Sequence, residues 1–175
     1  MSLIVKAVRL RFALTSKSAA TAQIRREAQR SIDLAKSVPP EKAAQSVAVP
    51  SMLGIDPEMR EWSLLQILEH NVIVNRRITE TIRALLQGNT LDSDDFDPKN
   101  DVLPSEQPAL AIIDEFSKSI GEHLAHIELE TSLKSSLTSK HPIFGPFDPH
   151  RWHCMFGFHL QIHRKQMEAV VKRLD

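Results

Sequence analysis

Apolar residues recur at intervals of three and four positions along most of this chain, which is the spacing of one face of an α-helix. The stripe is thin over the first such segment and strong in the three that follow. Because the helical period dominates almost everywhere and Gly is scarce, the pattern predicts an all-α bundle. The expected helices cover residues 16–38, a segment from Pro57 or Trp62 to Gln87, residues 106–130, and residues 149–174.

Helix-breaking and helix-capping residues mark the expected ends. Pro39 and Pro40 stop the first helix, because proline donates no amide hydrogen and clashes with the preceding turn. Gly88 is placed as a C-cap, and Asp148 is placed to cap the last helix with Pro149 in its first turn. Between the helices we expect a long connection at residues 41–60, an acidic one at 90–105 and a polar loop at 131–147, while residues 3–14 fit either a short helix or a strand.

Composition narrows the class of protein. The 175 residues are 42% hydrophobic and 25% charged, which fits one globular domain over residues 1–175. A net charge of zero argues against a nucleic-acid partner, since phosphate binding needs a basic face. No apolar run reaches membrane-spanning length, and Lys6, Arg9 and Arg11 interrupt the apolar opening segment, so we expect neither a membrane partner nor a signal peptide. The single cysteine, Cys154, indicates a reducing compartment and hence a cytoplasmic location.

Charge is distributed unevenly along the chain. Residues 1–40 hold eight Lys and Arg against two acids, whereas residues 89–115 hold one Lys against eight acids. The two regions therefore attract each other or a partner subunit, or they are simply solvated surface.

Two histidines interrupt the apolar stripe of the last helix. His159 and His163 are one turn apart and fall within the arc of the buried side. A buried imidazole needs a partner for each ring nitrogen, and an aligned pair can share one metal ion. The alternative is a pair of core histidines that carboxylates, waters or carbonyls satisfy. A catalytic metal site needs a third ligand, and His70 on another helix is the best candidate, although it lies about 100° from the centre of its helix's buried side.

The metal-site hypothesis also suggests roles for other side chains. Gln166, one turn after His163, is a candidate acceptor for the second nitrogen of that imidazole, or else a helix-flank amide. If a fourth ligand exists, His123 is the best candidate for it, while His150 and His153 are expected to be exposed. Cys154 falls on the polar side of its helix, where a packing role is favoured over a nucleophilic one. We expect four side chains to line a pocket beside the metal: His141, Trp62, Trp152 and Phe156.

Two segments of the chain resemble the DinB-like superfamily. They are EWSLLQILEHN, with Trp62, Ser63 and His70, and HPIFGPFDPHRWHCMFGFHLQIHRKQ, with Trp152, His159, His163 and Gln166. The resemblance implies an up-and-down four-helix bundle with a non-standard connection, and a divalent ion held by His70, His159 and His163. It also implies a homodimer.

The resemblance further implies a class of reaction. Characterised members include S-transferases that use low-molecular-weight thiols, so we expect a metal-dependent enzyme for a small-molecule substrate, with such a thiol as co-substrate. A metal-dependent hydrolase and a non-catalytic, stress-associated metal-binding bundle remain alternatives. Imidazole ligands suit Zn, Ni or Fe, and the sequence assigns neither the ion nor a catalytic residue.

Overall fold

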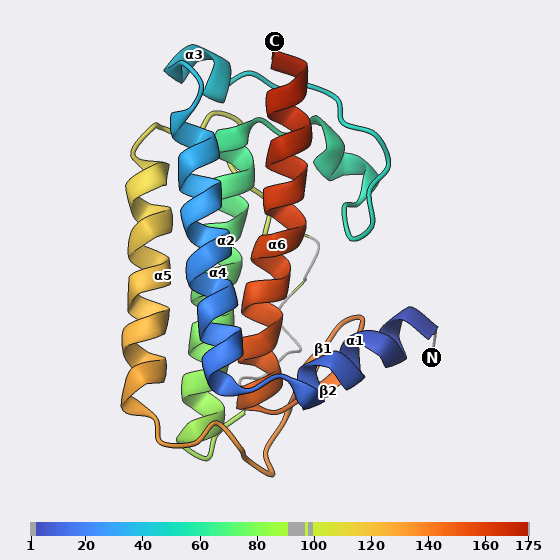
Figure 1. Cartoon of the computed structure of the whole chain (residues 1–175), viewed down its shortest axis with the longest axis vertical. Helices are drawn as coiled ribbons and strands as arrows, with labels where there is room; N and C mark the ends of the chain where they lie inside the picture. The colour runs from blue at the N-terminus through green and yellow to red at the C-terminus, as the bar shows by residue number, and fades with distance from the viewer. Residues whose placement is uncertain (1–2, 91–96, 98–99, 175) are drawn as a thin grey trace.

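The fold is a bundle of long helices with a short helix and a hairpin at one end (Figure 1). A computed structural model describes residues 3–90, 97 and 100–174. None of its helices in these ranges has both the length and the apolar character that crossing a bilayer requires. Its elements are α1 (Leu3–Leu14), α2 (Lys17–Lys36), α3 (Pro40–Ala43), η1 (Pro57–Glu61), α4 (Leu64–Leu86), α5 (Ile112–Leu129), β1 (Ser139–His141), β2 (Gly145–Phe147) and α6 (Pro149–Leu174).

Helices α2, α4, α5 and α6 form the four-helix bundle that the sequence predicts. Contacts along α4 and α5 advance in the same direction, from the Arg76–Glu115 ion pair to the Thr79–His123 hydrogen bond, so these two helices are parallel. Helices α2 and α6 are also parallel, and they run opposite to α4 and α5 (Figure 1). The connection between α4 and α5 must therefore return along the length of the bundle, which is the expected non-standard connection.

Local sequence explains where three of these helices begin. The Ser16 hydroxyl accepts a hydrogen bond from the backbone of Ala19 at the start of α2. Ser63 and Gln66 form a reciprocal capping box at the start of α4. Asp148 Oδ1 accepts from the Arg151 amide at 2.8 Å, which confirms the predicted cap of α6.

The third long helix starts later than expected, at Ile112 instead of residue 106. Pro108 disfavours helical backbone at the residue before it. The second turn of α4 also holds this segment in a non-helical conformation, because the Glu69 carboxylate accepts from the amide and hydroxyl of Ser105. Leu110, which lies just before α5, is accordingly 47% exposed.

Two connections contain structure that the sequence pattern did not predict. Residues 139–147 form a small antiparallel hairpin of β1 and β2, in which Gly145 adopts a φ of 76°. Residues 40–43 and 57–61 add the short helices α3 and η1 to the expected connection. The open question at residues 3–14 is resolved as a helix, α1, which packs against α6 and next to the hairpin (Figure 1).

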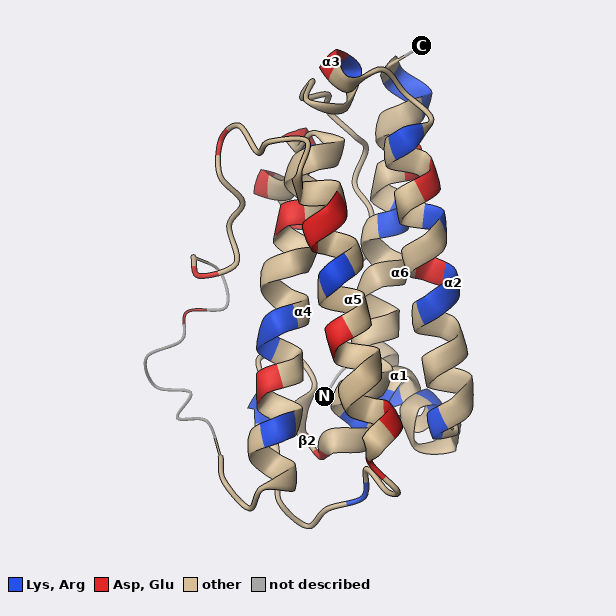
Figure 2. Cartoon of the chain, turned by 90° about the vertical axis from the view of Figure 1, so that its left-hand side faces the viewer, with Lys and Arg blue, Asp and Glu red and all other residues tan. Residues whose placement is uncertain are grey.

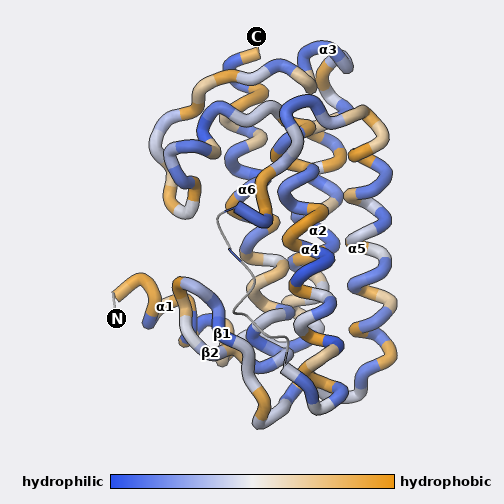
Figure 3. The backbone as a smooth tube through the Cα atoms, turned by 180° about the vertical axis from the view of Figure 1, so that it is seen from behind, coloured by the Kyte–Doolittle hydropathy of each residue, from blue (hydrophilic) through white to orange (hydrophobic). Residues whose placement is uncertain are grey.

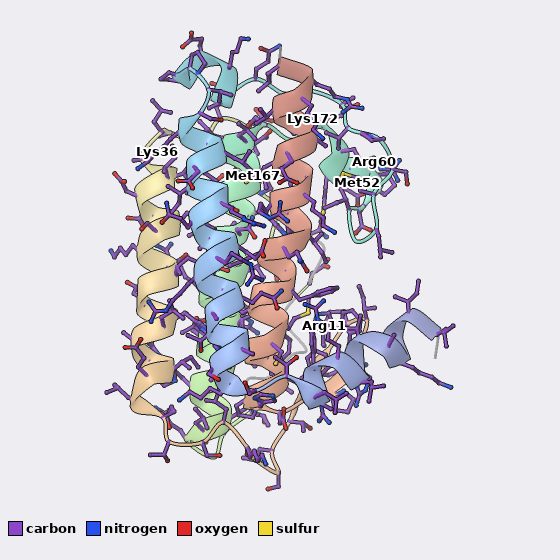
Figure 4. All side chains as sticks on the ribbon, in the orientation of Figure 1. Arg11, Lys36, Met52, Arg60, Met167 and Lys172 are labelled. Atoms are coloured by element: carbon purple, nitrogen blue, oxygen red, sulfur yellow. The ribbon has the colours of Figure 1, made fainter. Side chains whose placement is uncertain are left out.

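The core lies between the four long helices. Phe116 and Phe156 are fully buried in it, as is Met167, which Figure 4 shows on the inner side of α6. A buried ion pair also crosses this interior, because Arg164 Nε on α6 donates to Glu27 Oε2 on α2 at 2.6 Å. Half of the expected acidic connection at residues 90–105 falls outside the described residues.

Candidate metal centre

His70 is in the second turn of α4, where other parts of the chain cover it. It is 2% exposed, although its own helix places it away from the centre of the buried face. Two contacts explain this burial. The Trp62 ring lies with its centroid 5.1 Å from that of His70, and Val102 from the crossover connection lies against the imidazole. The burial of His70 is therefore a tertiary effect.

His159 and His163 extend from α6 toward His70. Their ring centroids are 4.5 Å apart, and they lie 5.2 and 4.6 Å from that of His70. One nitrogen from each of the three rings lies within 4.8 Å of the other two. His163 is buried, and His159 as a whole residue is partly exposed. The structure therefore brings together the three histidines that the sequence selected.

Hydrogen bonds determine which nitrogen of two rings faces the centre. A carbonyl can only accept, so His70 Nδ1–H donates to Val102 O at 2.7 Å. Gln166 Nε2 donates to Met59 O, which leaves its Oε1 to accept from His163 Nδ1–H at 2.8 Å. Both imidazoles therefore present an unprotonated Nε2 to the centre. These partners are of the kind that orients metal-bound histidines in known sites.

Burial keeps all three imidazoles neutral. It lowers the pKa of His70 to about 4, against the opposing effect of the Val102 carbonyl. It lowers the pKa of His163 to about 3. The pKa of His159 falls well below 6.5, first through burial and then through the neighbouring charges of His163, His70 and His141. Neutral imidazole is the form that coordinates a metal ion, so no proton has to be displaced near neutral pH.

The spacing of the nitrogens fits a divalent ion. His70 Nε2 and His159 Nε2 lie 3.2 Å apart. A tetrahedral ion with bonds of about 2.05 Å would hold two nitrogens about 3.3 Å apart. His159 Nδ1 is buried without a hydrogen-bond partner among the described residues. His159 therefore lacks a counterpart of the Nδ1 hydrogen bonds that orient His70 and His163. The donor set, three neutral imidazoles, suits Zn, Ni or Fe.

The four predicted pocket residues surround different parts of this region. Trp62 contacts His70, as described above. The centroid of the His141 ring lies 5.3 Å from that of Trp152, and the His141 charge influences the pKa of His159. Phe156 faces another way, because it stacks on His123 with a centroid distance of 3.9 Å.

His123 and His153 form a second cluster, which the sequence analysis did not predict. Both are fully buried, so the expectation that His153 is exposed is wrong. His123 Nε2 and His153 Nδ1 lie 3.0 Å apart, while the outer nitrogens of the pair contact Thr79 at 2.9 Å and Thr21 at 3.0 Å. Since both nitrogens of His123 are engaged here, this candidate for a fourth ligand is not available to the metal centre. Helix α2 covers His153, and no pattern within α6 reveals that contact.

Cys154 also lies inside the molecule, on a face that the sequence assigned to the polar side. It is 4% exposed because α1 covers it, with Sγ 3.8 Å from Phe12 O. Burial raises the pKa of the Cys154 thiol to about 12, which opposes a nucleophilic role and agrees with a packing one. His150 is 3.6 Å from this sulfur and donates to Thr15 O, so it is partly buried and not exposed.

Comparisons with known proteins agree with this architecture. The family model described as the DinB superfamily matches residues 23–167, a range that contains the three histidines and Gln166. A crystal structure of TT2238, described as a four-helix bundle protein, is similar to this chain, with a TM-score of 0.57 and 18% sequence identity. The similarity covers 88% of this chain and 99% of that one, and at this identity it shows the fold alone. No curated protein matches the sequence.

Proposed function

The chain belongs to the DinB superfamily, and from that premise we propose that it is a divalent-metal-binding enzyme that catalyses thiol-dependent S-transfer to a small-molecule substrate. The observation that carries the metal assignment is the convergence of His70, His159 and His163 within 4.8 Å. We propose these three as ligands and Gln166 as the residue that orients His163. Three protein ligands leave coordination positions free, as catalytic sites require.

The chain's own residues would hold and orient the reactants. When bound, the ion would supply Lewis acidity that lowers the pKa of a coordinated low-molecular-weight thiol. His70 and His163, each fixed by a hydrogen bond at Nδ1, keep Nε2 free to bind. Trp62, Trp152 and His141 are proposed to line the pocket for the electrophile, whereas Phe156, which stacks on His123, is not. The partial exposure of His159 supports access from solvent.

Metal content tests the assignment directly. Protein purified without a histidine tag should hold about one divalent ion per chain when measured by elemental analysis. His159→Ala should abolish this occupancy, because two imidazoles rarely retain an ion. His126→Ala is the matched control, since His126 is a partly buried histidine outside the cluster. Full occupancy in His159→Ala would refute the site.

Two alternative functions use the same centre. A hydrolase would bind water in place of the thiol, and its activity would persist when thiols are omitted. A non-catalytic, stress-associated bundle would use the ion structurally, which the position of the ligands on both α4 and α6 favours. Chelation separates these cases: an enzyme loses its reaction while it stays folded, whereas a structural site loses several degrees of melting temperature.

We also propose a homodimer in the cytoplasm. The superfamily resemblance supports the dimer, and the free, buried Cys154 supports a reducing compartment. Light scattering coupled to size-exclusion chromatography would determine the oligomeric state, and a monomer at all concentrations would contradict the dimer.

A further inference from the structure

Helix α1 has apolar residues on two opposite faces. Val5 and Phe12 are buried against the rest of the molecule. Leu3, Leu10 and Leu14 project the other way and are 83%, 61% and 78% exposed. Together with the exposed Ala7 they repeat at spacings of four, three and four residues, which forms one continuous stripe along the helix. Within the described residues this stripe contacts no other part of the chain closely enough to bury it.

The charged residues of α1 itself are all basic. Residues 3–26 contain no Asp or Glu, whereas the exposed surfaces of the four bundle helices carry both signs (Figure 2). Lys6 flanks the stripe on one side and Arg11 on the other. Arg11 lies beside α6, where it contacts the Phe158 ring and donates to Gln23, yet it stays exposed (Figure 4). The six basic residues of the segment are Lys6, Arg9, Arg11, Lys17, Arg25 and Arg26.

The position of α1 leaves its outer face accessible. The helix projects away from the bundle at the end where the hairpin lies, with hydrophobic positions along it (Figures 1 and 3). The Arg9 guanidinium donates to Phe144 O, which fixes α1 against the hairpin. Ile143, next to this contact, is itself 68% exposed. Helix α1 also precedes residues 23–167, so it is not part of the region that matches the superfamily.

Charge decides which partner fits this face. Pairing of the stripe with α1 of a second copy would bring the basic residues of both copies together, with no acid on either helix to offset them. An anionic lipid surface instead satisfies both features, because the leucines enter the boundary between headgroups and acyl chains while basic side chains remain at the headgroups.

We propose that α1 docks the protein on the surface of an anionic membrane, with Leu3, Leu10 and Leu14 inserted and Lys6 and Arg11 at the lipid headgroups. The helix lies in the interface plane and does not cross the bilayer. The sequence-based expectation of no membrane partner then holds for spanning segments only. This docking does not depend on the metal centre.

Sedimentation with lipid vesicles tests the proposal. The full chain should bind vesicles of phosphatidylcholine in which about a third of the lipid is phosphatidylglycerol, and should bind pure phosphatidylcholine at least about tenfold more weakly. Salt at about 0.5 M should weaken binding to the anionic vesicles, because it screens the headgroup charge.

Variants then separate the apolar and the charged contributions. The double variant Leu10→Ser/Leu14→Ser should bind at least about tenfold more weakly, since it removes two buried leucines. Lys6→Gln should weaken binding about fivefold. Leu129→Ser is the matched control, because Leu129 is 82% exposed at the end of α5, and it should bind as the unaltered chain does. Circular dichroism confirms that each variant is folded.

Three results would overturn the proposal. The first is absence of binding to the anionic vesicles at low salt. The second is equal binding by the double variant and the unaltered chain. The third is a change of oligomeric state in Leu10→Ser/Leu14→Ser without vesicle binding by the unaltered chain, which would assign the stripe to a second copy.

Discussion

At the scale of single residues, the candidate centre depends on which ring nitrogen of each imidazole carries the proton. His163 would be free to expose either nitrogen if its ring had no partner. Gln166 removes that freedom, because Met59 O occupies its amide hydrogen and only its carbonyl oxygen faces His163. Gln166 is fully buried between η1 and α6, so it cannot exchange this contact for one with water.

Replacement of Gln166 by Leu should therefore weaken metal binding while the ligands stay in place. We expect a loss of about 10- to 100-fold in affinity for Zn²⁺, which is typical when a hydrogen-bond partner of a metal-bound histidine is removed. Competition with a chromophoric chelator measures the change. Gln161→Leu is the control on the same helix, because Gln161 is partly exposed and is not among the residues that contact the three histidines. Equal affinities in the two variants would contradict the role of Gln166.

At the scale of elements, the two helical glycines show how closely the helices pack. A Cβ at Gly157 on α6 would lie 3.1 Å from Ile24 Cγ1 and 3.5 Å from the Ile24 amide nitrogen on α2. A Cβ at Gly121 on α5 would meet nothing within 4 Å. Gly157 therefore permits the close approach of α2 and α6, whereas Gly121 only lowers the helix propensity of α5.

The pair Gly157→Ala and Gly121→Ala should shift stability in opposite directions. Gly157→Ala should lower the free energy of unfolding by about 1–3 kcal/mol, the usual effect of overpacking. Gly121→Ala should raise it by about 0.5–1 kcal/mol through helix propensity. Urea denaturation with equal m-values measures both. A stabilised Gly157→Ala protein would show that α2 and α6 are not in close contact there.

At the scale of the whole molecule, one buried chain of hydrogen bonds joins all four bundle helices. Thr21 on α2, His153 on α6, His123 on α5 and Thr79 on α4 follow one another at about hydrogen-bonding distance. Thr79 donates to Asn75 O, so its oxygen accepts from His123 Nδ1–H, and His123 Nε2 accepts from His153 Nδ1–H. This chain requires a neutral His123, because a second proton on its Nε2 would face the Nδ1–H of His153.

This arrangement predicts acid sensitivity. Burial lowers the pKa of His153 to about 4 and the pKa of His123 well below 6.5, and the basic groups nearby act in the same direction. Between about pH 6.5 and pH 4 the unfolded chain binds more protons than the folded one, so the free energy of unfolding falls as the pH falls. Each histidine contributes at most about 1.4 kcal/mol per pH unit. The titratable and charged groups that face this pair are Lys17, Arg83, His126 and His150.

The double variant His123→Leu/His153→Leu isolates this contribution. In the presence of a chelator, its stability should depend less steeply on pH than that of the unaltered chain between pH 6.5 and 4, as urea denaturation at several pH values would show. The three histidines of the candidate centre titrate in both proteins, so the difference in slope belongs to the pair. An identical pH dependence of the free energy of unfolding in the two proteins would contradict a contribution from His123 and His153.

Local sequence patterns were sufficient to predict most of the helices, because a helix forms through contacts between residues that are three and four positions apart. The cap at Asp148 acts within one turn, so the sequence alone reveals the helix that follows it. The start of α4 was placed at Pro57 or Trp62, whereas Ser63 caps this helix. The start of α5 was predicted too early, since contacts between Glu69 and the backbone of Ser105 determine it across the bundle. The hairpin at residues 139–147 was missed because its strands are only three residues long.

The sequence by itself determined the helical class, the superfamily and the three histidines, since periodicity and motif spacing depend on residues close together in the chain. Tertiary packing determined the surroundings of each imidazole. The burial of His70 comes from Val102 and Trp62, and the pairing of His153 with His123 comes from the neighbouring helix α5. The contacts of His70 with Val102 and of His153 with His123 join residues 30 or more positions apart, and the hydrogen-bond partner of His70 is a backbone carbonyl, which every residue possesses and no motif can mark.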